Sequence, residues 1–128
     1  MRTDDKKHFV IEYYPDYTLV KVTEDKLDSV IAPLLKIKFQ ELVSINAKNI
    51  ILDISRCQYC DSSGLTVFLV GNRTCKLKGG VFLLVNVSDA IDRLLKISQL
   101  ITLVKVCKNV EEAVGIIDPS LKIHETYY

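Results

Sequence analysis

The chain has 128 residues, of which 17 are basic and 16 acidic, so its formal net charge is only +1. This length suits one compact domain with a real hydrophobic core and is short for two ordinary ones. A near-neutral chain lacks the broad basic field that holds nucleic acid or an anionic membrane, and we expect neither as a direct partner.

The N-terminal region is predicted to form a β-hairpin. Residues 8–14 and 17–23 are rich in β-branched and aromatic residues, and Pro15 lies in the turn between them. The first residues are charged and lack the continuous apolar core of a signal peptide. No apolar run in the chain reaches the roughly 18 residues that span a bilayer. We therefore expect a cytoplasmic protein.

A helix and a buried strand come next. Residues 27–43 have the apolar spacing of a helix that buries one broad face, and Asp28 or Ser29 could cap its start. The residues expected to face inward are Val30, Ile31, Leu34, Leu35, Ile37, Phe39 and Leu42. Residues 49–55 form a short apolar run, which is typical of a central strand buried on both faces.

A second helix is predicted over residues 62–77, where Lys78-Gly79-Gly80 provides a stop signal. Its expected inward residues are Leu65, Phe68, Leu69 and Leu77. The remaining elements are a buried strand over 81–87, a helix over 88–98, a strand over 101–107 and a short helix over 109–117. Residues 118–128 show no periodicity, and we expect them to form a loose tail.

The order β-β-α-β-α-β-α-β-α predicts an α/β fold. We expect one domain over residues 1–128, with its core at about 8–117. Its sheet should be mixed and mostly parallel, with an N-terminal hairpin, and it should pack against about four helices.

The cysteines are Cys57, Cys60, Cys75 and Cys107. A zinc site would need a second Cys-x-x-Cys or a Cys/His pair at ligand spacing, and the sequence contains neither. We interpret the four cysteines as reduced, mostly buried residues of a cytosolic protein, and we predict no metal site.

The stretch Asp61-Ser62-Ser63-Gly64 lies where a predicted strand passes into a helix, a position at which α/β proteins commonly meet ligands and partners. The residues alone leave three interpretations open. Asp61 or Ser62 could simply cap the helix, which contributes about 1 kcal/mol. A serine could be a nucleophile, or Ser62 could accept a phosphoryl group.

The nucleophile interpretation lacks a partner for the serine. The G-x-S-x-G elbow is absent, and the histidines, His8 and His124, lie near the two ends of the chain. Without a base to activate the hydroxyl, hydrolysis by this serine is disfavoured.

The motif and the residues after it resemble a known family. The stretch "CDSSGLTVFLVGNRTCKLKGG", continued by "VFLLVNVSDAIDRLLKISQL", is similar to the STAS domain of bacterial anti-sigma factor antagonists. The similarity runs from about residue 8 to residue 115. Earlier in the chain, Asp28, Ala32 and Leu35 match the spacing of the family's first-helix motif. The resemblance implies a STAS-like fold.

The resemblance also implies a function. In that family the first serine after the motif aspartate, here Ser62, is phosphorylated by a partner that is both a serine kinase of the GHKL ATPase type and an anti-sigma factor. The unphosphorylated antagonist sequesters this partner and releases a sigma factor, and a serine phosphatase resets the cycle. The chain would not itself be an enzyme and would need no cofactor. Asp28, Asp61, Ser63 and Gly64 would lie at the partner-binding surface.

The chain departs from the family pattern at two places. Asp25 and Lys26 replace a Gly-Glu pair, which changes charge on the expected contact surface, and Gln99 replaces a glycine in a turn. The resemblance also implies that Cys57 and Cys60 pack beneath the motif.

Two alternatives to the antagonist function remain. One is a STAS scaffold or sensor module whose serine is never modified, and the other is a small-ligand binder, which no phosphate-cradling glycine-rich loop supports.

Overall fold

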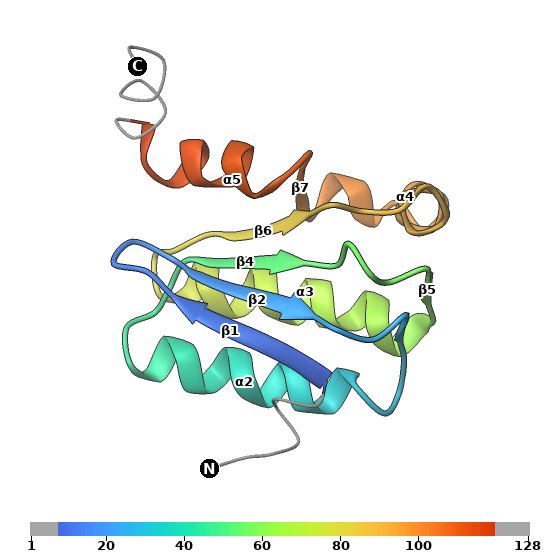
Figure 1. Cartoon of the computed structure of the whole chain (residues 1–128), viewed down its shortest axis with the longest axis horizontal. Helices are drawn as coiled ribbons and strands as arrows, with labels where there is room; N and C mark the ends of the chain where they lie inside the picture. The colour runs from blue at the N-terminus through green and yellow to red at the C-terminus, as the bar shows by residue number, and fades with distance from the viewer. Residues whose placement is uncertain (1–7, 120–128) are drawn as a thin grey trace.

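The computed structural model describes residues 8–119 as a five-stranded sheet with helices on both faces (Figure 1). The strands lie in the order β1-β2-β4-β6-β7. β1 and β2 are antiparallel, and every other neighbouring pair in this sheet is parallel. The predicted mixed, mostly parallel sheet with an N-terminal hairpin is therefore confirmed.

The strands and helices largely follow the predicted order. They are β1 (Phe9–Tyr13), β2 (Thr18–Val22), β3 (Lys26–Leu27), α2 (Ala32–Ser44), β4 (Ile50–Asp53), β5 (Tyr59–Cys60), α3 (Ser62–Leu77), β6 (Phe82–Val85), α4 (Asp89–Ile97), the 3₁₀ helix η1 (Leu100–Thr102), β7 (Lys105–Cys107) and α5 (Val110–Ile117). The four α-helices of the described region agree with the predicted number. β3 and β5 form a small second sheet that the sequence did not predict.

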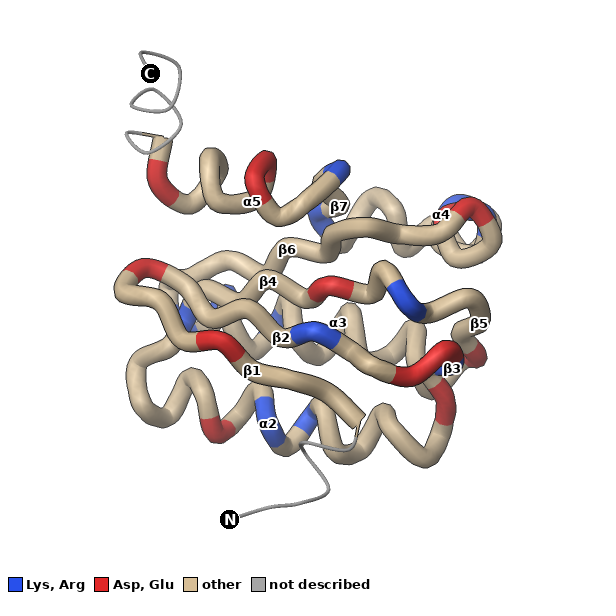
Figure 2. The backbone as a smooth tube through the Cα atoms, in the orientation of Figure 1, with Lys and Arg blue, Asp and Glu red and all other residues tan. Residues whose placement is uncertain are grey.

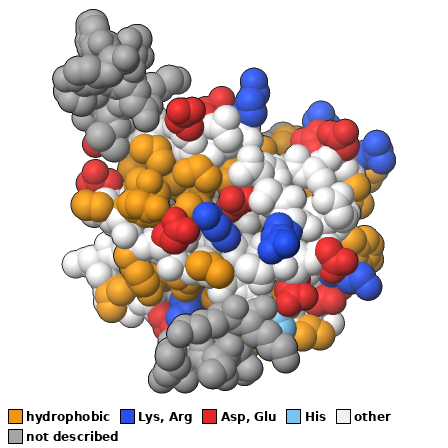
Figure 3. Space-filling model, viewed as in Figure 1, with side chains coloured by type: hydrophobic (Ala, Val, Ile, Leu, Met, Phe, Trp, Pro, Cys, Tyr) orange, Lys and Arg blue, Asp and Glu red, His pale blue; other side chains and the backbone are white. Residues whose placement is uncertain are grey.

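The hydrophobic core has two unequal parts. The larger one lies between the sheet and helices α2, α3 and α4, and four buried phenylalanines belong to it: Phe9, Phe39, Phe68 and Phe82. Full burial of such a side chain contributes roughly 1.5–3 kcal/mol. The smaller part lies on the other face, where α5 packs over β4, β6 and β7. Figure 3 shows hydrophobic side chains gathered between α5 and the β1–β2 hairpin. α5 does not cover these side chains in this view.

Two predicted boundaries are wrong. The helix predicted over 27–43 begins only at Ala32, because the residues before it form β3 and then a turn. The strand predicted over 101–107 is confined to Lys105–Cys107. Gln99 adopts a left-handed φ of 65° and turns the chain into η1. The first residues of the predicted strand therefore cannot adopt an extended conformation.

Some residues predicted to face the core do not. Val30 and Ile37 lie on the outer side of the α2 region, and Leu77 is exposed at the end of α3. All three are apolar residues of an otherwise amphipathic segment, and apolar atoms commonly remain on protein surfaces. The tail predicted over 118–128 lies outside the described residues apart from its first two positions.

Candidate functional site

The residues before α3 are held by two short strands that lie far apart in the sequence. β3 pairs in parallel with β5, so that Leu27 lies opposite Cys60. The Asp25 carbonyl accepts a hydrogen bond from the Gln58 N–H at 2.8 Å, and the Leu27 carbonyl accepts one from the Asp61 N–H at 3.3 Å. These bonds fix the start of α3 against the residues that precede α2, at the right-hand end of Figure 1.

Asp61 is the N-cap of α3. Its backbone is extended, with φ −97° and ψ −171°, and its Oδ1 accepts a hydrogen bond from the Gly64 N–H at 3.1 Å. Its carbonyl accepts the first helical hydrogen bond, from the Leu65 N–H at 3.0 Å. An aspartate in this position satisfies one of the N–H groups that a helix leaves unpaired at its start. Of the two capping residues considered from the sequence, Asp61 performs this role.

Ser62 is the first residue of α3, and it is exposed. Its carbonyl accepts a hydrogen bond from the Thr66 hydroxyl at 2.8 Å, whereas its own hydroxyl has no hydrogen-bond partner within residues 8–119. Ser63, the next residue, is half-buried. Because Asp61 caps the helix, the Ser62 hydroxyl has no structural task here and is left free to react or to contact another molecule.

Gly64 is buried, and its neighbours explain why no larger residue fits. A Cβ atom at this position would lie 2.3 Å from the Leu27 carbonyl oxygen and 2.5 Å from the Cys60 Sγ. Both distances are far shorter than real van der Waals contacts. The missing side chain of Gly64 therefore makes room for β3 and β5 of the same chain, which lie directly against the first turn of α3.

Asp28 organises the turn between β3 and α2. Its Oδ1 accepts hydrogen bonds from the Val30 N–H at 3.0 Å and the Ile31 N–H at 3.4 Å, and its carbonyl accepts one from the Ala32 N–H at 2.8 Å. Asp28 follows Leu27, the residue that contacts the motif, so β3 carries it to the same end of the molecule as the start of α3. It thus caps a turn before the helix, since α2 itself starts four residues later.

Cys57 and Cys60 are buried beneath this site. The Cys57 thiol donates to the Glu24 carbonyl at 3.3 Å, and the Cys60 thiol donates to the Asp61 carbonyl at 3.4 Å. Burial raises the pKa of each thiol to about 12, and nearby carboxylates add to the effect. Both thiols are therefore protonated and weakly reactive at neutral pH. Their predicted role as packing residues beneath the motif is confirmed.

The end of the molecule that carries Ser62 has charged and apolar side chains at its surface, and its basic residues are Lys26 of β3 and Arg56 before β5. Figure 2 shows acidic residues at the end of the molecule where β3 and β5 lie, and those on this part of the chain are Glu24, Asp25, Asp28 and Asp61. Among apolar side chains, Tyr59 of β5 and Val30 before α2 are exposed. An exposed hydroxyl at the same end of the molecule as an exposed tyrosine and polar side chains is suited to docking of another protein, because interfaces combine aromatic residues with a polar rim.

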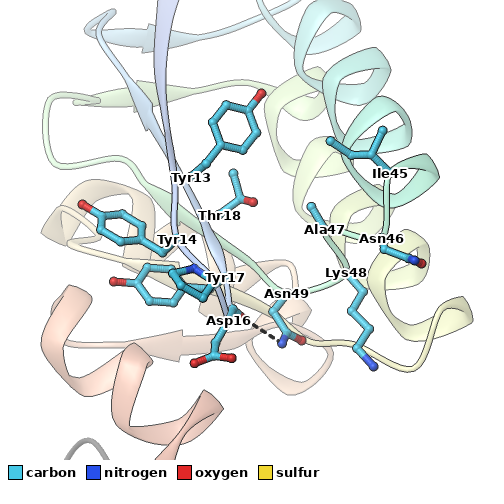
Figure 4. A pocket seen from close by; sticks show the side chains of 11 residues that line it. Tyr13, Tyr14, Asp16, Tyr17, Thr18, Ile45, Asn46, Ala47, Lys48 and Asn49 are labelled. Atoms are coloured by element: carbon cyan, nitrogen blue, oxygen red, sulfur yellow. Dashed lines mark hydrogen bonds between the residues drawn. The ribbon is translucent and has the colours of Figure 1, made fainter.

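A hollow lies at the opposite end of the sheet, where β2, β4 and β6 start and β1 ends. It measures about 350 Å³, and the hairpin turn and the loop between α2 and β4 form its walls (Figure 4). The Tyr14 and Tyr17 rings stack at 4.7 Å on one side, and the Asn49 amide donates to the Asp16 carbonyl at 3.0 Å at its base. It contains none of the predicted site residues.

The described residues give little support to a serine nucleophile, a metal site or a membrane-spanning helix. His8 lies 3.2 Å from a Glu24 carboxylate oxygen, and no hydrogen bond joins it to Ser62. Within residues 8–119 no group of three or more His, Cys, Asp or Glu side chains is arranged to hold a metal ion. None of the helices in this region has the length and hydrophobicity needed to cross a bilayer.

Comparison with known proteins identifies a matching domain family and several similar solved structures. The model of the STAS domain family matches residues 8–113. A Thermotoga maritima protein described as a candidate anti-sigma factor antagonist is 26% identical and superposes with a TM-score of 0.75, covering 85% of this chain and 93% of its own. The unphosphorylated anti-sigma factor antagonist SpoIIAA is 21% identical, with a TM-score of 0.72 and coverage of 85% and 95%. Phosphorylated SpoIIAA from Bacillus is 22% identical, with a TM-score of 0.66 and coverage of 85% and 98%.

Proposed function

This chain belongs to the STAS domain family, and we propose that it is an anti-sigma factor antagonist switched by phosphorylation of Ser62. The resemblance predicted from the sequence is confirmed, and the fold matches that of proteins described as antagonists. In its unphosphorylated form the chain would sequester an anti-sigma factor that is also a GHKL-type serine kinase, and so release a sigma factor in the cytoplasm. A serine phosphatase would restore binding. The kinase would supply ATP and catalytic groups, so this chain would act as substrate and inhibitor, not as an enzyme.

The free hydroxyl of Ser62 is the observation that carries the proposal. A kinase needs a hydroxyl that it can reach and that can be modified without unfolding the substrate. Ser62 is exposed and Asp61 performs the capping, so a phosphate can be added without loss of the cap. The unpaired N–H groups and positive dipole at the start of a 16-residue helix favour negative charge at this position. The fold should therefore tolerate phosphoserine.

The same phosphate would oppose binding of the partner. It adds a charge of about −1.5 to −2 next to Asp61 in the chain, at the end of the molecule that also carries Asp28. Moving a complex from almost fully formed to almost absent requires about 5.5 kcal/mol of differential affinity. Enclosing a poorly paired dianion in an interface costs energy of that order, because its hydration is lost. The switch then needs no conformational change in this chain.

The other predicted residues would form the docking surface around this hydroxyl. Asp28 lies at the same end of the molecule, and its second carboxylate oxygen could accept from a basic or polar group of the partner. Ser63 is half-buried beside Ser62 and would contact the partner or serve as a minor phosphate acceptor. Gly64 would contribute through its backbone and through the close packing that it allows.

A phosphorylation assay tests the proposal. The purified chain is incubated with Mg-ATP and a candidate GHKL-type serine kinase, and the phosphate is located by mass spectrometry. We expect phosphate on Ser62 in the wild type and in Ser63→Ala, the matched control, and at most a minor signal, on Ser63, in Ser62→Ala. Since the Ser62 side chain has no hydrogen-bond partner within residues 8–119, Ser62→Ala should change stability by less than about 0.5 kcal/mol.

A capture assay separates the proposal from the scaffold alternative. We expect wild type and Ser62→Ala to retain the kinase on a column and Ser62→Asp to release it. If the wild type carries no phosphate at Ser62 and Ser62→Asp captures the partner as well as wild type does, the chain is a constitutive STAS scaffold and the switch is refuted.

A further inference from the structure

The outer side of β1 has backbone groups without partners in the described chain. β1 is an edge strand. At its two ends the Tyr14 N–H donates to the Tyr17 carbonyl, and the Thr23 N–H donates to the His8 carbonyl, both at 2.9 Å. Bonded and non-bonded residue pairs alternate along an antiparallel ladder. The even-numbered residues of β1 therefore bond to β2, and its odd-numbered residues direct their N–H and C=O groups away from the sheet.

These outward groups belong to Phe9, Ile11 and Tyr13, and within residues 8–119 no element covers the edge that they form. Natural edge strands avoid pairing with other chains by being very short or by carrying lysine, proline or a bulge. β1 has five residues and a continuous register with β2, and its one charged residue, Glu12, bonds to Lys21 at 3.1 Å. The opposite edge strand, β7, has only three residues and begins with a lysine.

We propose that the β1 edge is an interface between two copies of this chain, which pair antiparallel about a twofold axis at Ile11. This register makes Ile11 face itself and Phe9 face Tyr13 of the second copy as hydrogen-bonded pairs. Every outward N–H of both copies then meets an outward carbonyl. Val10 faces Glu12 of the second copy, so no like charges oppose each other. The two sheets become one continuous sheet.

The side chains beside the β1 edge are also placed to contact a second copy of the chain. A hollow of about 360 Å³ lies between β1 and α2, lined by Tyr13, Lys38, Glu41, Leu42, Ser44 and Ile45. Tyr13 is 63% exposed and Ile45 is 66% exposed, and both residues also border the hollow of Figure 4. A second copy placed along β1 covers the exposed side chains of Tyr13 and Ile45, which pairing of the backbone alone would leave in water.

The interface is separate from the candidate phosphorylation site. Ser62 starts α3 beside β5, whereas β1 lies at the edge of the main sheet (Figure 1). A dimer formed through β1 therefore presents two accessible Ser62 hydroxyls, and its existence does not depend on whether Ser62 is phosphorylated.

Sedimentation equilibrium of the full chain over a concentration series tests the interface. We expect the apparent mass to rise from 14.5 kDa toward twice that value. Tyr13→Lys places a charge on the edge and should weaken association at least tenfold. Tyr59→Lys is the matched control, because Tyr59 is a 52% exposed tyrosine away from this edge, and it should dimerise like wild type. A wild type that stays monomeric up to about 1 mM overturns the proposal.

A second experiment tests the register. Chains carrying Val10→Cys are mixed with chains carrying Glu12→Cys, since these positions face each other across the twofold axis at about 4.5 Å between Cα atoms, within disulfide reach. Mild oxidation should link the two kinds of chain at least tenfold faster than it links a mixture of Val30→Cys and Glu12→Cys. Equal rates overturn the proposed pairing. The four native thiols are buried and should not compete.

Discussion

Replacing Gly64 by alanine should separate the start of α3 from the small β3–β5 sheet. The added methyl group would lie 2.3 Å from the Leu27 carbonyl oxygen and 2.5 Å from the Cys60 Sγ. The sulfur atom could move slightly, but the Leu27 oxygen belongs to the backbone and accepts the hydrogen bond of the Asp61 N–H. The clash therefore acts directly on the contacts that position the cap and the free serine.

The expected loss of stability is the net of two opposing effects. Overpacking of a rigid site costs typically 1–3 kcal/mol, and a backbone obstacle points to the upper end of that range. Alanine in place of glycine inside a helix returns about 1 kcal/mol through its better helix propensity. The net prediction is a free energy of unfolding about 2 kcal/mol lower than that of wild type.

Urea denaturation monitored by circular dichroism would measure this loss. The double variant Cys60→Ala with Gly64→Ala removes one of the two obstacles, so a double-mutant cycle should show a favourable coupling of about 1 kcal/mol. A Gly64→Ala protein within about 0.5 kcal/mol of wild type would refute the reasoning, because it would mean that β3 and β5 can move away from α3 at almost no cost.

Other substitutions test further features of the structure. Asp61→Ala removes the cap of α3 and should lower the free energy of unfolding by about 1 kcal/mol. Asp61→Asn should keep most of the stabilisation that the cap provides, because asparagine also caps helices well. A loss in Asp61→Asn as large as that in Asp61→Ala would contradict the capping role. Burial raises the pKa values of Cys57 and Cys60 to about 12, so the unfolded chain releases these protons at lower pH than the folded chain does. The free energy of unfolding should therefore fall from about pH 9 toward pH 12, by up to about 1.4 kcal/mol per pH unit for each thiol. Urea melts across this range should therefore show a shallower decline in Cys57→Ala, and an identical slope would disprove the assignment. Asp53 is buried and accepts a hydrogen bond from the Asn86 amide at 3.1 Å, so Asp53→Ala should cost about 1–3 kcal/mol in thermal or urea unfolding, and a neutral result would mean that water replaces the carboxylate.

Most helices could be predicted because their signals are local. α3 ends where a lysine and two glycines interrupt the apolar spacing, and the predicted limits, 62 and 77, are those of the structure. α4 and α5 begin after Ser88 and Asn109, whose side chains accept hydrogen bonds from backbone N–H groups three residues later. Capping depends on a few consecutive residues, so the sequence contains all the information that it requires.

The errors occurred where distant parts of the chain decide the local conformation. Apolar spacing alone extended the first helix back to residue 27, but Leu27 instead pairs with Cys60, 33 positions along the chain. No local pattern predicts a two-residue strand, because it buries little surface and exists only when its partner is near. Likewise no intrinsic preference of glutamine predicts the left-handed φ of 65° that Gln99 adopts before η1.

The sequence by itself therefore determined the family, the order of strands and helices, and the position of Asp61 and Ser62 at the start of a helix. It could not determine which of the two caps that helix and which hydroxyl stays free, because both residue types can accept the same hydrogen bond. Only the tertiary structure decided this, by tying the Asp61 N–H to Leu27 and directing its carboxylate to Gly64. The physical reason is that a hydroxyl stays without a hydrogen-bond partner only if no folded segment around it offers one, and this depends on the whole tertiary structure.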